Sequence, residues 1–595
     1  MNINGDNKNR IVAFKKSNFV KDLIIFLIPV AIFLYYLYVF DPGILTYESY
    51  NQLHQIATKQ YTNWYPFFHT LIEKACIKIY PSPISICVLQ ILTFSTMWTI
   101  ICRAFRDNDA GFDKVFIIQA IITLAISLIP INALYSITLW KDILFSYFLM
   151  FLVFMIYQLL TKKGNVSYAF AIILSIVMAF VAQLRPNGIF IIVIMLVILA
   201  IYLYRKNKDK KLYLIVPALT IILILLIASL NVAFDVEDTQ KDEVFTKVSH
   251  MLANYDMNLD ISKEDRTMIH YLIDESSIKS KYQPTYSDPI WKAANEQVFN
   301  HNKATYIGMA IKYSISNPVY FLKYISSSAP IVWDITRDGN WVGNVYKTDI
   351  NNENRAFYSN NLTPTSKYDG MMARHPGSAE YGVLNKFAYD IKDNFRTDTL
   401  FDSPALYMYL AIILLVAIHI LTRSKNIYAA YIPNLLNIIL VLFTIPMQDN
   451  RYLYPNLLVA YLLIIILIWA FVNRNSNPPV VIRITDDENL PGDSRFYYEG
   501  SYTHEEAPLD NENYKDLLKK RNNSGKISEE SYTHKEVPRK KGDSENVKNI
   551  KGVEEIIIPE KESEEMTEET PEEMEARIRA KVLKELEMEE KNRDE

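Results

Sequence analysis

Long apolar segments constrain this chain more than any other feature of its sequence. A helix needs roughly 20 predominantly apolar residues to cross the hydrocarbon core of a bilayer. Ten segments come close to that length, at residues 22–40, 84–102, 115–132, 143–160, 168–184, 188–204, 212–232, 405–422, 428–446 and 453–472. The sequence therefore predicts an all-α protein built as a polytopic transmembrane helix bundle of about ten spans.

Every second short loop of this predicted bundle is rich in lysine and arginine. They precede the first span, separate the second from the third, and follow the fourth, sixth, eighth and tenth, at Lys15, Lys16, Lys21, Arg103, Arg106, Lys114, Lys162, Lys163, residues 205–211, Arg423, Lys425 and Arg474. Basic loops tend to stay in the cytoplasm. We therefore expect a multi-pass protein of the cell membrane with both termini in the cytoplasm. The first apolar run lacks a small-residue cleavage site, so we expect it to be retained as a span.

The predicted spans divide the membrane part of the chain into three regions. Residues 1–232 are expected to form an N-terminal bundle with a first outer loop at 41–83, and residues 403–472 the C-terminal spans. Residues 233–402 are long enough for a small extracytoplasmic domain and read as mostly helical. The apolar stretch 304–333 within them has enough apolar residues to pack on the bundle or to lie on the membrane surface.

A charged tail, residues 473–595, follows the last predicted span. It carries a short repeat, SYTHEEAP at 501–508 and SYTHKEVP at 531–538, in polar sequence that cannot bury a core. We expect a mostly disordered cytoplasmic tail in which only residues 563–593 have a helical pattern. Such a tail is a candidate for binding protein partners.

Composition excludes two further classes. The formal net charge is −4, and no basic surface suited to nucleic acid is visible. The three cysteines, Cys76, Cys87 and Cys102, are too few for a disulfide framework and form no evident metal motif.

The loop after the first span, DPGILTYESYNQLHQIATKQYTNWYPFFHT, concentrates acidic, imidazole and aromatic side chains. Glu48 enters an amphipathic helical stretch, where partial burial would raise its pKa and suit it to act as a general base. Asp41 is the competing candidate, and a helix-start acid is the plain alternative for Glu48. His54 and His69 lack metal-ligand spacing, so we expect polar contacts from them, although a divalent metal stays open. Trp64 is one of the aromatic residues of this loop.

Cationic side chains lie at the outer ends of three predicted spans. Lys141 stands beside Asp142 in TLWKD, Arg185 precedes Asn187 in RPNG, and Arg451 lies in NRYLYP. Arginine and lysine bind phosphate as a planar fork and as a point charge. The alternative is a set of interfacial anchors and a simple turn. Because the three cations share one side with the acidic loop, we favour a common site for an anionic substrate.

These motifs resemble those of the GT-C superfamily of polytopic glycosyltransferases. YESYNQL with NWYPFFHT, then TLWKD, RPNG and NRYLYP, look closest to a bacterial GT-C-like membrane family without an assigned substrate, over about residues 1–472. In that family we expect an Asp at the position of Glu48 and a His-Pro at Tyr65-Pro66, so this chain departs at both. The resemblance implies a polyprenyl-phosphate-linked sugar donor, bound as a membrane lipid in the outer leaflet, and a cell-envelope glycan or protein as acceptor.

The resemblance also implies roles for individual residues. Glu48 or Asp41 would be the base, and the three cations would stabilise charge on the departing lipid phosphate. The expected substrate-binding residues are Lys141, Asp142, Arg185, Asn187, Arg451, His54, His69 and Trp64.

Two other classes stay open. A transporter or flippase of a lipid-linked or anionic glycan would need ionisable groups within its spans and broken helices in matched halves. The predicted spans hold few ionisable groups and show no internal repeat. A non-catalytic membrane scaffold is the third alternative.

Overall fold

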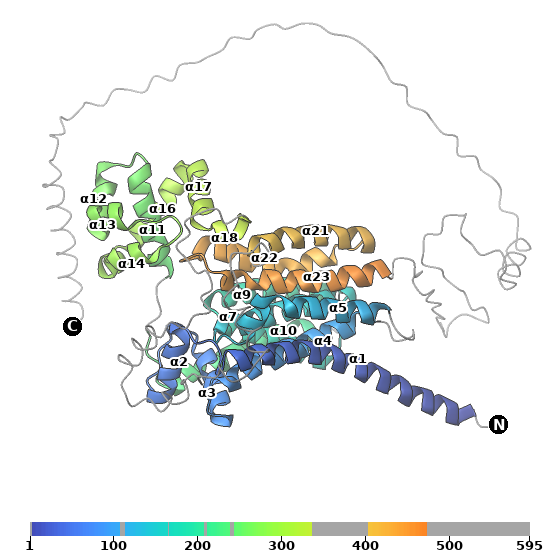
Figure 1. Ribbon diagram of the computed structural model, residues 1–595. Coiled ribbons are helices and arrows are strands. Elements are labelled where there is room, and N and C mark those ends of the chain that lie inside the picture. Colours follow the sequence, from blue (N-terminus) through green and yellow to red (C-terminus); the bar gives the residue numbers. More distant parts are fainter. Residues whose placement is uncertain are drawn as a thin grey trace, which may run out of the picture. The chain divides into compact units, whose positions relative to one another are not determined.

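The computed structural model describes residues 3–106, 114–164, 166–206, 211–238, 243–335 and 403–472. Within these ranges the regular elements are helices, accompanied by a few isolated β-bridges (Figure 1). The prediction of an all-α fold is confirmed for this part of the chain. The charged tail with its repeat and predicted helix 563–593, and residues 336–402, lie outside the described ranges.

Each of the ten predicted apolar segments coincides with a helix or a bent pair of helices. These are α1 (Ile3–Val39), α4 (Ile84–Ala104), α5 (Lys114–Leu128) with α6 (Pro130–Ser136), α7 (Lys141–Thr161), α8 (Tyr168–Leu184), α9 (Pro186–Lys206), α10 (Leu212–Ala233), α21 (Pro404–Thr422), α22 (Asn426–Thr444) and α23 (Tyr454–Val472).

Eight helices in the described part of the chain are long and apolar enough to cross a membrane. The pair α5 and α6, bent by 72° where Pro130 opens the second helix, would be a ninth span. Helix α8 is apolar but has only 17 residues. At 1.5 Å per residue such a helix is about 26 Å long, at the short end of the range for a span. The helices are compatible with a multi-pass membrane protein.

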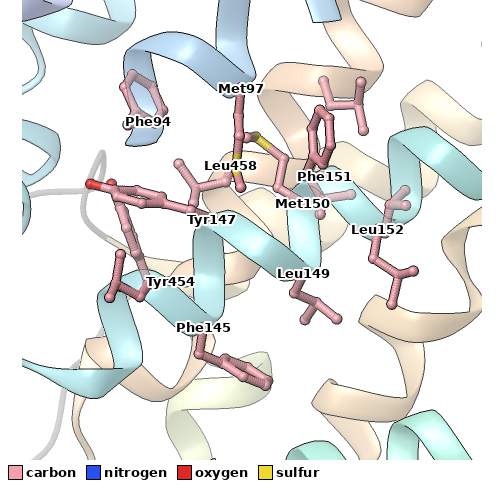
Figure 2. Close-up of a cluster of buried hydrophobic side chains, with 14 of the residues drawn as sticks. Phe94, Met97, Phe145, Tyr147, Leu149, Met150, Phe151, Leu152, Tyr454 and Leu458 are labelled. Atoms are coloured by element: carbon pink, nitrogen blue, oxygen red, sulfur yellow. The ribbon is translucent and has the colours of Figure 1, made fainter. Parts of the chain in front are cut away.

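Helix α7 lies at the centre of the bundle and contacts α4, α8, α22 and α23. The aromatic ring of Tyr147 lies 5.3 Å from Phe94 of α4 and 6.4 Å from Tyr454 of α23, between ring centroids (Figure 2). Lipid tails are as apolar as these side chains, so close packing, rather than escape from water, holds such helices together. A buried central helix also fixes the position of the residues at its first turn.

Buried polar side chains join the helices around this centre. Asn434 of α22 donates to Asn456 of α23 at 3.0 Å, and the Tyr454 hydroxyl donates to Asn132 of α6 at 3.0 Å. The Trp98 indole of α4 donates to Thr123 of α5 at 2.8 Å. Interhelical hydrogen bonds of this kind each contribute about 0.6–2 kcal/mol in a membrane.

Two short helices, α2 (Tyr47–Thr58) and α3 (Phe67–Ile79), form the loop between α1 and α4. The loop is attached to the chain before α7 by a parallel bridge, in which Ile44 donates to the Ile137 carbonyl at 2.8 Å and accepts from Leu139 at 3.2 Å. Gly43 makes this approach possible. Its φ is +118°, and an added Cβ would lie 2.6 Å from the Cys87 sulfur.

The region between α10 and α21 contains α11 (Glu243–Asn258), α12 (Lys263–Leu272), α13 (Glu275–Lys281), α14 (Asp288–Ala293), α15 (Glu296–His301), α16 (Lys303–Ser316), α17 (Pro318–Ser328) and α18 (Pro330–Trp333). We call residues 243–335 the interposed region. It has a hydrophobic core of its own, which includes Phe245, Leu252, Tyr255, Phe299 and Tyr306. Side chains of Ser262, Asp274 and Asn295 cap three of its helices, as expected for polar residues that precede a helix.

Candidate active site

Two hydrogen bonds place the first turn of α2 beside the first turn of α7. The Trp140 indole donates to the Thr46 hydroxyl at 2.8 Å, and the Ser49 hydroxyl donates to the Leu139 carbonyl at 2.9 Å. Glu48 lies between Thr46 and Ser49 in sequence. Its side chain therefore reaches the residues that begin α7.

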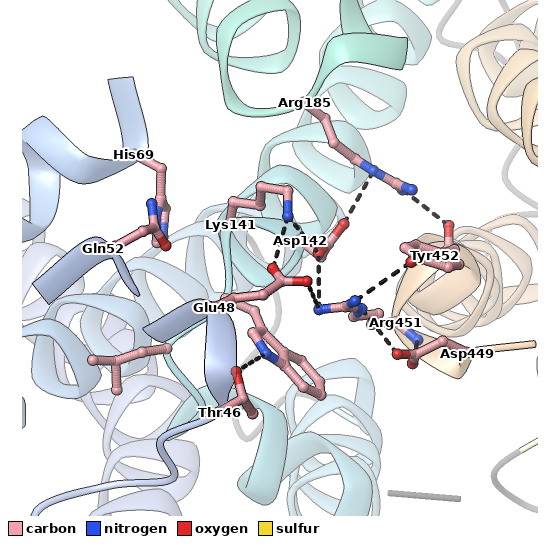
Figure 3. Close-up of polar contacts among 12 residues, drawn as sticks. Thr46, Glu48, Gln52, His69, Lys141, Asp142, Arg185, Asp449, Arg451 and Tyr452 are labelled. Carbon is pink, nitrogen blue, oxygen red and sulfur yellow. Dashed lines mark hydrogen bonds and ion pairs between the residues drawn. The ribbon is translucent and has the colours of Figure 1, made fainter. Parts of the chain in front are cut away.

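The Glu48 carboxylate bridges two cations from different parts of the chain (Figure 3). Its Oε2 lies 2.8 Å from Lys141 Nζ, and its Oε1 lies 2.7 Å from Arg451 Nη1. Lys141 opens α7, whereas Arg451 lies in the 3₁₀-helix η2 (Asn450–Leu453) that precedes α23. The Glu48 carboxylate thus joins the start of α7 to the segment that precedes α23.

Asp142 forms the second centre of the cluster and is fully buried. Its Oδ1 lies 3.0 Å from Arg185 Nε, and its Oδ2 lies 3.8 Å from Lys141 and 3.9 Å from Arg451. Neither oxygen accepts a hydrogen bond from the described residues. Three cations surround this carboxylate without saturating its hydrogen-bonding capacity.

Aromatic rings and a third carboxylate enclose the cations. Lys141 Nζ lies 4.9 Å from the Tyr65 ring centroid, and the Arg451 guanidinium lies 4.7 Å from the Trp140 ring. Asp449 Oδ2 lies 2.9 Å from Arg451 Nε. Cation–π contacts of this kind are stronger where water is excluded.

The cluster contains three acidic and three cationic side chains, and the two cations nearest Glu48 set the pKa of its carboxyl group. Glu48, Asp142 and Asp449 oppose Lys141, Arg185 and Arg451, and each of these side chains is at least four-fifths buried. Burial raises the pKa of Glu48, but the charges of Arg451 and Lys141 outweigh burial and lower the pKa to about 2. The raised pKa expected from the sequence is therefore wrong for this state, because two cations lie within hydrogen-bond distance.

A second group of buried polar residues lies on α2 and α3. His69 is fully buried, and its Nδ1 lies 3.1 Å from the Gln52 amide nitrogen and 3.6 Å from Glu73 Oε1. Burial, followed by the positive charge of Lys141, lowers the pKa of His69 to about 3, and burial raises the pKa of Glu73 well above its usual range. His69 is therefore neutral at pH 7. His69 makes the polar contacts predicted for it, whereas Glu73 was not singled out, although its position four residues after His69 places both on one helix face.

The remaining predicted site residues lie outside these ion pairs. The Trp64 ring lies 6.2 Å from that of Trp291, and the Asn187 amide donates to the Thr444 hydroxyl at 3.3 Å. His54 is half-buried on α2, and Asp41 follows α1; the ion pairs described above are formed by other residues. Asp449 was missed by sequence reasoning, although it stands two residues before Arg451. No group of three His, Cys, Asp or Glu side chains in the described ranges could hold a metal ion.

The loop that carries Asp449 and Arg451 is attached to the interposed region. The Gln448 amide donates to the carbonyls of Thr285 and Ser328, both at 3.0 Å, and accepts from the Ile331 backbone at 3.2 Å. Ser287 donates its backbone N–H to the Pro446 carbonyl at 2.9 Å. The interposed region therefore fixes the segment that delivers Arg451 to Glu48.

Comparison of the chain with protein-family models, with curated proteins and with solved structures finds no match. The geometry of the charged cluster and the motifs of the sequence therefore carry the functional conclusion.

Proposed function

We propose that this protein is a membrane glycosyltransferase of the GT-C type, which moves a sugar from a polyprenyl-phosphate-linked donor to an acceptor of the cell envelope. One observation carries the proposal. Glu48, Lys141, Asp142, Arg185 and Arg451, from four separate segments, meet in one buried cluster of acids and cations. Clusters of buried ionisable groups are costly unless other interactions compensate them, and they concentrate at functional sites.

The proposed location follows the sequence. The alternation of basic loops supports ten spans, cytoplasmic termini and an extracytoplasmic position for both the cluster and the interposed region. An extracytoplasmic site beside the bilayer suits a lipid-linked donor better than a nucleotide sugar, because the lipid presents its phosphate at that surface. The motif resemblance to GT-C enzymes supports the same assignment.

The proposed reaction forms one bond and breaks one. The acceptor hydroxyl oxygen attacks the anomeric carbon of the donor sugar, and the bond from that carbon to the phosphate oxygen breaks with its electron pair staying on the phosphate. The donor phosphodiester carries one negative charge, and the departing polyprenyl phosphate gains a second. Lys141, Arg185 and Arg451 would stabilise this added charge, and the acceptor proton would pass to Glu48.

Glu48 can act as this base only if its cations are drawn away from it. Lys141 and Arg451 hold its pKa at about 2 in the free state, too low for efficient proton transfer near neutral pH. A donor phosphate that binds the same two cations would compete with the carboxylate. Burial would then dominate and raise the pKa of Glu48, so that donor binding itself would activate the base.

A direct test uses the full-length protein in lipid nanodiscs with a radiolabelled polyprenyl-phosphate hexose and isolated cell-envelope material as acceptor. We expect release of polyprenyl phosphate and labelling of the acceptor, both lost in Lys141→Met. Donor that crosses the bilayer of a proteoliposome uncleaved would instead establish a transporter. Failure to bind the donor lipid in either system would leave the scaffold alternative.

A further inference from the structure

The helix pair α16 and α17 is apolar on two opposite faces. One face of α16 packs into the core of the interposed region through Tyr306, Met309 and Tyr313. The other face carries Ile311 and Ile315, which are 53% and 74% exposed. A helix on the surface of a water-soluble domain normally has a polar outer face, so an apolar outer face calls for an apolar neighbour.

Helix α17 repeats this arrangement. Tyr324 and Ile325 are buried, whereas Val319 and Leu322 on the opposite face are 81% and 66% exposed. Each of the two helices, on either side of the break at Pro318, thus exposes an apolar face. We call Ile311, Ile315, Val319 and Leu322 the apolar ridge.

Helix α17 and the following α18 contact two of the long apolar helices. The apolar ridge therefore lies next to a predicted membrane boundary. Helix α17 contacts α22, and α18, which follows it, contacts α21. The Tyr409 hydroxyl of α21 donates to the Trp333 carbonyl at 2.9 Å, and the Trp333 indole donates to the Ser326 carbonyl at 3.0 Å. Tyrosine and tryptophan concentrate at the boundary between acyl chains and headgroups.

The outer face of α21 continues from this boundary along the helix. Tyr409, Ile413, Val416 and Ile420 follow one another at helical spacing, and all four are exposed. In a helix that crosses a membrane, such a stripe faces acyl chains. We propose that the apolar ridge is a lipid-contact surface, by which the α16–α17 pair is seated in the bilayer at the end of α21 and α22.

Lipid is the neighbour that fits the ridge, because the ridge adjoins helices that are themselves long enough to cross a bilayer. Helices with one polar and one apolar side bind at the membrane interface in proportion to the apolar area that they bury. The inference depends on the spans and not on transferase activity, so either conclusion can fail without the other.

Site-specific fluorescence in nanodiscs tests the ridge in the full-length protein. Cys76, Cys87 and Cys102 are buried, so the unmodified protein should take up little thiol-reactive NBD dye and serves as the blank. The dye is attached to Ile315→Cys or Val319→Cys, one on each helix. Ile413→Cys on α21 is the lipid-facing reference, and Ser280→Cys on an exposed part of α13 is the aqueous reference.

We expect the two ridge positions to give blue-shifted emission and to be quenched by nitroxide-labelled lipids to a degree approaching Ile413→Cys and well above Ser280→Cys. Quenching by aqueous iodide without quenching by lipid would overturn the proposal. Quenching by neither reagent would also overturn it, because it would show that protein, either residues 336–402 or a second copy of the chain, covers the ridge. Exposed single substitutions rarely unfold a protein, and two positions on separate helices guard against a local artefact.

Discussion

Glu48 Oε1 and Arg451 Nη1 lie 2.7 Å apart, although Glu48 follows the first long apolar helix and Arg451 precedes the last. This pair closes the bundle, and Lys141 shares the same carboxylate. Without a bound substrate, the Glu48 carboxylate is therefore the counter-ion of both Lys141 and Arg451. The same two cations are the proposed phosphate ligands, so substitutions here should separate binding from catalysis.

Glu48→Gln keeps the size of the side chain and removes its charge. We expect transfer to fall by roughly 10²- to 10⁴-fold, the usual effect of losing a general base. Binding of polyprenyl phosphate should tighten, because the carboxylate that competes for Lys141 and Arg451 is gone. Turnover of radiolabelled donor and lipid binding are measured separately in nanodiscs. Asp41→Asn is the matched control; if it abolishes transfer while Glu48→Gln retains it, the base is Asp41.

Acid should remove the stabilising effect of Glu48. The folded-state pKa of Glu48 is about 2, below its ordinary value of 4.5. A depressed carboxyl pKa contributes stability that is fully present above the unfolded pKa and is lost as pH falls through the folded pKa. The thermal midpoint of the unmodified protein should therefore fall more steeply than that of Glu48→Gln between about pH 4.5 and pH 2. Parallel curves for the two proteins would contradict the ion-pair assignment.

Sequence reasoning located the helices and most of the cluster, but not its internal geometry. The length of an apolar segment is a local property of the sequence, so every predicted span coincides with a helix or a bent pair of helices. Counting the spans then places Lys141, Arg185 and Arg451 on the same side of the bundle. The direction of the Glu48 pKa shift depends on two cations brought together by packing, which no local pattern encodes. Asn187 belongs to the same turn as Arg185, yet its side chain contacts α22 instead, because adjacent residues point to different neighbours.

Gln448 should act as a positioning residue for Arg451. Gln448→Leu keeps similar volume but removes hydrogen bonds to Thr285, Ser328 and Ile331. We expect faster hydrogen–deuterium exchange in residues 445–453 and 326–332, together with weaker polyprenyl phosphate binding. The same change at the exposed Gln60 is the control and should alter neither quantity. Faster exchange with unchanged lipid binding would show that Gln448 supports the fold but not the position of Arg451.

Gly43 and Gly308 provide a matched pair for backbone strain. Gly43→Ala forces a Cβ onto a residue with φ of +118° and within 2.6 Å of Cys87 sulfur, so we expect destabilisation by more than about 1 kcal/mol. Gly308 lies in α16, where an added Cβ meets no atom within 4 Å. Gly308→Ala should stabilise its helix by about 0.5–1 kcal/mol. Thermal midpoints of both variants in the same detergent decide the comparison, and equal shifts would show that Gly43 is not required for the loop to reach α7.

Arg451→Met should be the most damaging single change in the cluster. It leaves Glu48, Asp142 and Asp449 with one counter-ion fewer, and removing one partner of a buried ion pair typically costs about 3–5 kcal/mol. The double variant Glu48→Gln with Arg451→Met removes the unbalanced charge along with its partner, so much of the lost stability should return. Unfolding of the four proteins gives the coupling energy of the pair. Additive losses would show that the 2.7 Å contact contributes no coupling. Recovery of stability without recovery of donor binding would indicate that Arg451 binds the phosphate as well as holding Glu48.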